Sequence, residues 1–420
     1  MTSAVMACMK DEAMFVVEWV AYHLVIGFDT VVVCTNNCSD GTDALLDRLA
    51  GLAPVVHIRN DDLGGLAPQR AGVLKALAHP AVRSADWLLH IDADEFLNIQ
   101  HGSGHTGDLI AVVDAFDAVA LTWKLFGDSD FTVWNGGLVT ELQTRCKQKL
   151  ADFWSTQKTM FRPALFGSGI DHMPKEPRRP DVRLCNAVGR ELNPGAMHDP
   201  KTSDHRVAFG QEINRKRHMG WDGACINHYA VRSQDLFLLK NVRGDGIGSA
   251  HASRYFLHSR WHRAANRNEV EDTTILRHLP AMKAMEPWSL DRRFPRADRR
   301  IALAITSPTK GWLEVNNALC ATLGFSKDEL SGMTWAQITH PEDLSADVEQ
   351  FNRMLTGDID HYAMDKRFIH KAGHVVYTRL SVSNVRKPDG SIDYVLAVVE
   401  DISERHLAQQ ALEIERAHLS

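Results

Sequence analysis

The N-terminal part of the chain alternates between short apolar runs and segments with helical spacing. Runs of mostly β-branched and other apolar residues predict strands at Ser3–Cys8, Thr30–Cys34, Val55–Ile58 and Trp87–Ile91. Between them, apolar side chains recur at three- and four-residue steps, which predicts helices over Phe15–His23, Asp43–Leu49 and Pro68–Leu77. This alternation predicts an α/β domain with an open, mostly parallel sheet and helices on both faces.

The pattern is less regular from about residue 114 to residue 285. Strands are predicted at Ala118–Trp123, Lys158–Phe161 and Ile226–Val231, and a helix at Asp235–Arg243. The segment Pro174–Asp204 is rich in Pro, Arg and Asn and shows no clear period, so it is interpreted as long loops.

The pattern changes again after residues 286–300, a charged segment with two prolines that we interpret as a linker. Short strands are predicted at Trp312–Val315, Tyr362–His370, Val375–Val385 and Ile392–Glu400. The tail is helical by composition, and its leucine and isoleucine spacing suggests the start of a coiled coil that could support a homodimer. The chain is therefore divided into residues 1–285, a linker at 286–300, a small α+β domain at 301–403, and a C-terminal helix at 404–420.

Composition and charge narrow the class of protein. A length of 420 residues favours two domains, and a net charge of −6 argues against a partner that is a nucleic acid. No run approaches the roughly 18 to 20 apolar residues that span a bilayer. The start of the chain lacks the features of a signal peptide. Seven cysteines are few for this length and odd in number, so a framework of disulfides is not expected. These features predict a cytoplasmic protein, with peripheral membrane contact left open.

Polar residues follow the predicted strands at the edge of the sheet where ligands bind in such folds. Asp92 and Asp94 come after the strand Trp87–Ile91, two residues apart, so both carboxylates can address one point. Mg²⁺ and Mn²⁺ prefer oxygen ligands, commonly one or two carboxylates with substrate phosphates. The spacing alone is weak evidence for a metal site, because an Asp-x-Asp sequence is also common in solvated loops.

Several blocks in order resemble the family-2-like glycosyltransferases, which have the glycosyltransferase A-type fold of nucleotide-diphospho-sugar transferases. The resemblance covers about residues 3 to 250 and rests on Lys10–Glu12, Glu18–His23, Asn36–Thr42, His90–Phe96, Trp123–Gly127, Lys158–Pro163, Asn227–Tyr229 and Lys240–Gly244. It implies transfer of a sugar from a nucleotide-diphosphate sugar, assisted by Mn²⁺ or Mg²⁺, to a glycan, lipid-linked or protein acceptor. The donor sugar, the acceptor and the stereochemical outcome stay open.

The resemblance also implies roles for particular residues. Those expected near the nucleotide are Glu12, Asn36, Asp40, Gln69 and Arg70. Each has a structural alternative: a helix-start carboxylate for Glu12, a helix cap for Asp40, and a solvated helix face for Gln69 and Arg70.

Asp92 and Asp94 are the expected metal ligands, joined by His228 after the late strand. A hydrogen-bonded structural histidine is the alternative for His228, and His172 and His198 are weaker candidates. An inverting transfer needs a carboxylate base. Glu95, Asp128, Asp130 and Glu141 are open for this role, and none is assigned.

The C-terminal part resembles a PAS domain over about residues 297 to 405. The resemblance rests on Gly311–Cys320, Leu323–Gly332, Thr339–Asp343 and the exit Ala397–Arg405. It implies a small antiparallel sheet with flanking helices that serves sensing or dimerisation, with an unknown ligand or none. The alternative function for the whole chain is a non-catalytic PAS-containing signalling or binding protein whose transferase domain has decayed.

Overall fold

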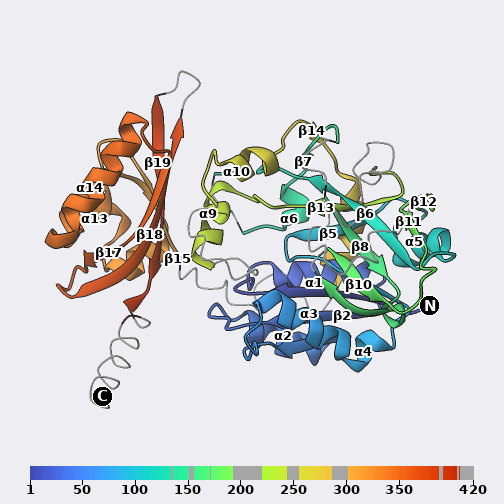
Figure 1. Cartoon of the computed structure of the whole chain (residues 1–420). Coiled ribbons are helices and arrows are strands. Elements are labelled where there is room, and N and C mark those ends of the chain that lie inside the picture. Colours follow the sequence, from blue (N-terminus) through green and yellow to red (C-terminus); the bar gives the residue numbers. More distant parts are fainter. Residues whose placement is uncertain are drawn as a thin grey trace, which may run out of the picture. The chain divides into compact units, whose positions relative to one another are not determined.

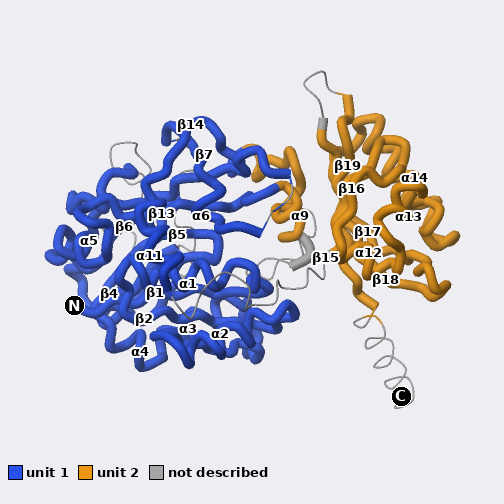
Figure 2. The backbone as a smooth tube through the Cα atoms, turned by 180° about the vertical axis from the view of Figure 1, so that it is seen from behind, with its two compact units in different colours: residues 1–233, 246–248, 264–295 blue, residues 234–245, 249–263, 296–420 orange. Residues whose placement is uncertain are grey.

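The computed structural model describes most of the chain as two compact units (Figure 2). The described residues are 1–132, 134, 136–150, 156–170, 172–192, 220–243, 255–285, 301–386, 391–403 and 406. The first unit contains residues 1–233 and 264–285, and the second contains 234–243, 255–263 and the C-terminal domain. The predicted linker 286–300, most of the predicted helix 404–420 and His198 lie outside the described residues.

Parallel strands form the first half of the N-terminal sheet, in the order β4-β1-β2-β3 (Figure 1). They are β1 (Ser3–Met9), β2 (Thr30–Thr35), β3 (Val55–Arg59) and β4 (Trp87–His90). The helices between them are α1 (Val16–Val25), α2 (Thr42–Ala50), α3 (Pro68–Ala78) and α4 (Pro80–Arg83). This part of the fold confirms the predicted α/β pattern.

The two faces of this sheet bury different side chains. Val73 and Ala76 of α3 share a buried cluster with Ala4 and Met6 of β1. Right-handed crossovers place α1 and α2 on the opposite face, because the strand order reverses direction after β3. The reversal puts the ends of β1 and β4 side by side, which is where ligands bind in sheets of this kind.

The second half of the sheet is mixed. β8 (Gln157–Phe161) lies antiparallel between β4 and β6 (Ala118–Leu125). β13 (Ala224–His228) runs parallel to the end of β6 and antiparallel to β5 (Glu95–Ile99), which directly follows the Asp-x-Asp motif. The sheet is therefore mixed, with parallel pairs predominant in its first half.

The interpretation of Pro174–Asp204 as long loops is wrong for its described part. Residues 174–192 contain most of β10 (Met173–Pro177), together with β11 (Leu184–Asn186) and β12 (Glu191–Leu192). β10 pairs with β9 (Phe166–Ile170), while β11 extends the main sheet beside β6. These strands are too short for a period of two to stand out, and β11 also pairs with β6, which is remote in the sequence.

The remaining elements of the N-terminal domain are short. They are α5 (Thr106–Val113), α6 (Val139–Leu142), β7 (Arg145–Cys146), η1 (Pro163–Leu165), β14 (Val270–Glu271), η3 (Thr274–His278) and α11 (Leu279–Ala284). The helix α10 (Arg260–Ala265) has its first four residues in the second unit.

The C-terminal domain is a five-stranded antiparallel sheet in the order β16-β15-β19-β18-β17. Its strands are β15 (Ile301–Thr306), β16 (Trp312–Val315), β17 (His361–Ile369), β18 (Val375–Arg386) and β19 (Ile392–Asp401). One face packs under α12 (Asn317–Leu323), α13 (Lys327–Ser331), η4 (Trp335–Ile338) and α14 (Pro341–Thr356). The predicted strands are present, and β15 adds a strand that the pattern did not reveal.

The other face of this sheet is covered by α9 (Gln234–Arg243), which belongs to the same unit (Figure 2). Leu396 and Val398 of β19 are buried, yet they alternate with the residues of the helix-covered core and so point to the opposite face. α9 contacts both β18 and β19, and the hydroxyl of Tyr394 donates to Oε1 of Gln234 at 3.4 Å. The outer face of the C-terminal sheet is therefore buried at β19, whereas Asp365 of β17 is exposed on the same face.

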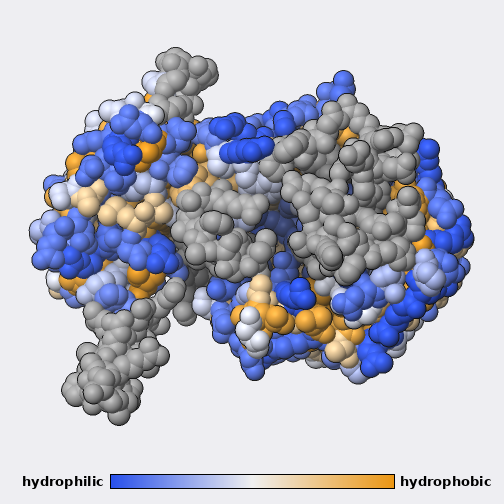
Figure 3. Space-filling view, viewed as in Figure 1, coloured by the Kyte–Doolittle hydropathy of each residue, from blue (hydrophilic) through white to orange (hydrophobic). Residues whose placement is uncertain are grey.

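Hydrophilic residues cover much of the described surface visible in Figure 3, with hydrophobic residues in smaller patches. In the part of the chain that the structure describes, no helix has the length and apolar character needed to cross a membrane.

Candidate functional site

The Asp-x-Asp motif forms the turn between β4 and β5. The backbone N–H of Asp92 donates to Oε2 of Glu95 at 2.9 Å, and the N–H of Tyr229, just past β13, donates to the carbonyl of Asp94 at 2.8 Å. The side chain of Asp92 is 31% exposed and that of Asp94 is 13% exposed. Both carboxylates thus lie where the ends of β4 and β13 meet.

Asp92 is held on both carboxylate oxygens. Lys158 of β8 donates to Oδ2 at 2.9 Å, and Gln69 of α3 donates to Oδ1 at 3.3 Å. Gln69 therefore lies at the motif, while its contact with a nucleotide stays a prediction. The next residue, Arg70, is on the exposed side of α3, which fits the alternative of a solvated helix face.

Glu95 lies beneath Asp92 and is fully buried. Its Oε2 is 3.4 Å from Nζ of Lys158, while Oε1 has no hydrogen-bond partner among the described residues. Burial raises the pKa of Glu95 well above its usual value, and the charge of Lys158 acts in the opposite direction.

His228 lies opposite Asp94. Nε2 of His228 is 3.5 Å from Oδ1 of Asp94, and the His228 ring is 4.2 Å from the ring of Trp123, measured between centroids. Neighbouring ligands of an octahedral Mg²⁺ or Mn²⁺ ion, each bound at about 2.1 Å, lie about 3 Å apart. The Asp94–His228 pair therefore fits two ligands of one ion, although the same contact also suits a structural histidine.

The three predicted metal ligands do not come together as one set. No group of three or more His, Cys, Asp or Glu side chains within the described ranges has the arrangement of a metal site. Asp92 instead faces Lys158 and Gln69. A metal at this position would thus take Asp94 and His228 from the protein and complete its coordination with phosphate or water oxygens.

Glu12 is buried at the end of β1, where it pairs with Arg232. Nη1 of Arg232 is 3.1 Å from Oε2 of Glu12, and Nη2 donates to the carbonyl of Ala93 at 2.9 Å. The guanidinium also stacks on Phe15, 3.7 Å from the ring centroid. Arg232 therefore joins the end of β1 to the middle residue of the Asp-x-Asp motif.

Asp40 is not the N-cap of α2, because that position is taken by Gly41, but its side chain contacts the first residue of the helix. Its Oδ1 accepts from the N–H of Thr42 at 3.0 Å and from the Thr42 hydroxyl at 2.5 Å, at the start of α2. Its Oδ2 accepts from the N–H of Ala13 at 2.8 Å. Asp40 thus ties the end of β1 to the start of α2, and Asn36 lies half-buried in the same loop.

Three of the four candidate bases are engaged elsewhere. Asp128 accepts from the side chains of Asn266 and Asn268 at 2.8 and 2.9 Å, which makes it a loop-stabilising residue. Asp130 pairs with Arg145, and Glu141 pairs with Lys283, both at the surface. Glu95 lies at the motif but is fully buried, so the base stays unassigned.

Lys158 and Arg232 were missed as site residues. Arg232 follows the predicted strand Ile226–Val231, and the rule that polar residues at strand ends face the site could have found it. Lys158 begins one of the blocks that resemble the glycosyltransferases. Its position inside a strand, however, does not predict that it is buried against carboxylates.

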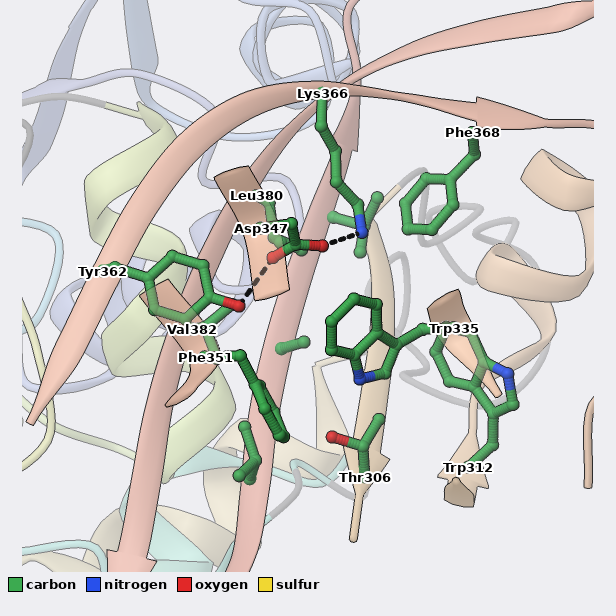
Figure 4. A pocket seen from close by; sticks show the side chains of 13 residues that line it. Thr306, Trp312, Trp335, Asp347, Phe351, Tyr362, Lys366, Phe368, Leu380 and Val382 are labelled. Atoms are coloured by element: carbon green, nitrogen blue, oxygen red, sulfur yellow. Dashed lines mark hydrogen bonds and ion pairs between the residues drawn. The ribbon is translucent and has the colours of Figure 1, made fainter. Parts of the chain in front are cut away.

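The core of the C-terminal domain contains a second candidate site, a cavity lined by aromatic and aliphatic side chains (Figure 4). The space amounts to about 330 Å³, part of it open to solvent. Nζ of Lys366 lies 2.5 Å from Oδ2 of Asp347, and the hydroxyl of Tyr362 donates to Oδ1 at 2.8 Å. Lys366 also donates to the hydroxyl of Thr339 at 3.0 Å and lies over the rings of Trp335 and Phe368.

These polar groups satisfy one another without a ligand. Burial lowers the pKa of Lys366, and the charge of Asp347 opposes this shift. Lys366, Asp347 and Tyr362 therefore hold one another in place inside the domain core.

Comparison with known proteins places relatives on the C-terminal domain. A family model described as "PAS fold" matches residues 313–399. The probable diguanylate cyclase DgcE of Escherichia coli (strain K12) is 42% identical over 110 residues, covering 26% of this chain and 10% of that protein. The bacterioopsin transcriptional activator of Halobacterium salinarum is 25% identical over 114 residues, covering 27% of this chain and 17% of that protein.

Solved structures match the same region. The PAS-B domain of Drosophila melanogaster Cycle with bound ethylene glycol is 18% identical and covers 24% of this chain and 98% of that one, with a TM-score of 0.23. The N-terminal domain of a diguanylate cyclase with a PAS/PAC sensor from Marinobacter aquaeolei is 24% identical, covers 25% and 98%, and has a TM-score of 0.23. The chain spans only 10% and 17% of the two curated relatives. The family match, together with the antiparallel five-stranded sheet, shows that residues 313–399 form a PAS domain.

Proposed function

We propose that the N-terminal domain is a metal-assisted glycosyltransferase that uses a nucleotide-diphosphate sugar. The observation that carries the proposal is the meeting of Asp94 and His228 beside Asp92 at the end of β4. The resemblance of the surrounding blocks to family-2-like glycosyltransferases supports the same reaction. The acceptor class stays a glycan, a lipid-linked sugar or a protein.

Each residue of the site has a distinct part in this proposal. Asp94 and His228 would hold Mn²⁺ or Mg²⁺, which supplies positive charge to the diphosphate leaving group. Gln69 and Lys158 fix the carboxylate of Asp92. Arg232 anchors the turn through the carbonyl of Ala93 and keeps Glu12 in place at the edge of the site.

The test is calorimetric titration of UDP and GDP into the full chain, with and without Mn²⁺. We expect metal-dependent binding of one nucleotide that Asp94→Ala and His228→Ala each weaken. Removal of an outer-shell partner typically lowers the metal affinity of a site by about 10- to 100-fold. We expect each substitution to weaken Mn²⁺-dependent nucleotide binding by at least this factor. Asp365→Ala is the matched control, because it removes an exposed carboxylate from the PAS domain.

Two outcomes would contradict the proposal. If the folded wild-type chain bound neither nucleotide, the decayed-platform alternative would replace it. If binding survived in both Asp94→Ala and His228→Ala, the donor site would lie elsewhere and His228 would be a structural residue.

We infer that the PAS domain regulates the transferase domain through α9. The helix begins at Gln234, directly after the segment that carries His228 and Arg232, and it covers the outer face of the PAS sheet. Phe256, from the same part of the chain, stacks on His361 of β17 with 3.6 Å between ring centroids. A homodimer built on this sheet face would have to displace α9, so intramolecular regulation is the favoured role.

Substitution of Leu396 tests this link. Leu396→Ala removes a buried contact on the face towards α9, so hydrogen exchange in residues 234–243 should accelerate by about tenfold or more. Mn²⁺-dependent nucleotide binding should weaken severalfold in the same variant. The control is Val395→Ala, which removes a buried side chain from the adjacent residue on the opposite face. Equal rates of hydrogen exchange in α9 for the two variants would refute regulation through this helix.

A further inference from the structure

Two histidines lie where α9 and the segment 255–263 pack on the PAS sheet, all within the second compact unit. The ring of His262 meets Phe237 of α9 edge-on, with 5.0 Å between ring centroids. His361 of β17 stacks on Phe256, with 3.6 Å between centroids and 10° between the ring planes. Both phenylalanines are fully buried. The two histidines therefore join the segment 255–263 to α9 and to the PAS sheet.

The hydrogen bonds of His262 require a neutral ring. Its Nδ1 accepts from the backbone N–H of His258 at 3.3 Å, so this nitrogen carries no proton. The proton of the ring is then on Nε2, which is buried and has no hydrogen-bond partner within the described part of the chain. Protonation would point a second N–H at the donor of His258. It would also place a charge on a side chain of a residue that is only 6% exposed.

The groups around His262 also oppose its protonation. Burial, the largest cause, together with the charges of His258 and Arg263, lowers the pKa of His262 to about 4. On α9, the charged side chains that the structure describes are Asp235 and Lys240, and neither forms an ion pair with His262. The ring therefore has no counter-charge that would hold a proton on it in the docked arrangement.

His361 acts in the same direction but more weakly. Its Nδ1 is buried and has no hydrogen-bond partner in the described structure. Burial lowers the pKa of His361, and the charge of the exposed Asp360 opposes this shift. The residues that face it from β18 and from the segment 255–263 are Ser383 and Phe256, both uncharged.

We propose that His262 and His361 form a pH-sensitive latch, which holds α9 and the segment 255–263 on the PAS sheet while both rings are neutral and weakens as the pH falls. A histidine with a lower pKa in the docked arrangement than in the free segment stabilises docking fully above about pH 6.5. That stabilisation is lost as the pH falls from there towards 4. The latch stands on the contacts of the two histidines, whereas its effect on the donor site rests on the proposed regulation through α9.

The test is hydrogen exchange of the full chain at pH 7.5 and pH 5.5, expressed as protection factors that correct for the intrinsic effect of pH on exchange. Protection in residues 234–243 and 255–263 should be about tenfold lower at pH 5.5. The reason is that each pH unit below about 6.5 weakens docking by about tenfold until the pKa of the docked ring is reached. Equal protection at the two pH values would overturn the latch.

Two substitutions remove the protonation while keeping the contacts. His262→Asn retains an acceptor for the N–H of His258, and His361→Phe retains a ring that stacks on Phe256. The double variant should show the same protection at both pH values. His374→Asn is the control, because it removes an exposed histidine from the same domain and should respond to pH as the wild type does. A pH response in the double variant equal to that of the wild type would refute the latch.

A measurement on the wild type alone guards against a variant that fails to fold. Deuterium exchange at the ring C2–H of His262 reports its pKa directly in the full chain. A value near 4 to 5 is expected, and an ordinary value of about 6.5 would overturn the inference.

Nucleotide binding separates the latch from the proposed function. At pH 5.5 the double variant should bind UDP or GDP with Mn²⁺ more tightly than the wild type, and at pH 7.5 the two should bind equally. A pH-dependent latch without nucleotide binding at either pH would uphold this inference and refute the transferase. Equal binding by both proteins at pH 5.5, with the difference in exchange present, would uphold the latch and refute regulation through α9.

Discussion

Lys366→Met should destabilise the PAS domain by about 3–5 kcal/mol, the usual cost of removing one partner from a buried ion pair. Asp347 would keep its negative charge in an apolar core, with only the hydroxyl of Tyr362 still donating to it. The lost Lys366 contacts to the rings of Trp335 and Phe368 add to the cost. An effect of this size is a large part of the stability of a typical domain.

The measurement is hydrogen exchange in residues 301–403 of the full chain, because the two units need not unfold together. Arg379→Met is the matched control on the neighbouring strand, since it removes the cation of an exposed ion pair with Asp365 and should cost about 1 kcal/mol or less. Lys366→Met combined with Asp347→Asn should recover much of the loss, because no unpaired charge is left. Exchange in Lys366→Met no faster than in Arg379→Met would show that the pair is not a buried charge pair in solution.

Lys366 also shows which buried polar residues a sequence can reveal. In β17 the residues Tyr362, Met364, Lys366 and Phe368 fall on one face by the period of two, and their neighbours fall on the other. The period of two therefore predicts that a lysine in register with Tyr362 and Phe368 points into the core. The acid that pairs with it, Asp347, lies on α14 and could be identified only from the packing of that helix on the sheet.

The parallel half of the N-terminal sheet was predictable for a similar reason. β1, β2 and β4 are largely buried runs of apolar residues, and β1, β2 and β3 are each followed by a helix, so local pattern and tertiary structure agree. The mixed half depends on pairings between remote segments. β13 pairs with both β5 and β6, and the local pattern of Ala224–His228 does not predict these pairings.

The candidate site likewise has a part that the sequence predicts and a part that depends on pairing between remote strands. Asp92 and Asp94 follow β4 and His228 ends β13, so strand ends and the family resemblance were enough to name them. The role of Asp92 was not predictable, because it depends on Lys158 of β8, a strand inserted between β4 and β6. Sequence spacing therefore identified the carboxylates, while the contacts that Asp92 makes are set by the topology of the sheet.

Arg232→Met should affect both stability and the proposed donor site. Glu12 would stay buried without the guanidinium that pairs with it, and loss of one partner from a buried ion pair costs about 3–5 kcal/mol in comparable cases. The same substitution removes the hydrogen bond to the carbonyl of Ala93, so the turn that carries Asp92 and Asp94 loses its anchor. We therefore expect Mn²⁺-dependent nucleotide binding to weaken by at least about tenfold even in the folded fraction.

The two effects of Arg232→Met can be separated by a second substitution. Adding Glu12→Gln removes the carboxylate charge, so the free energy of unfolding should recover while nucleotide binding stays weak, because the anchor at Ala93 is still absent. Lys283→Met is the control, since its ion pair with Glu141 is exposed and should matter little to either property. Full recovery of binding in the double variant would mean that Arg232 acts only by neutralising Glu12, and the anchoring role would have to be abandoned.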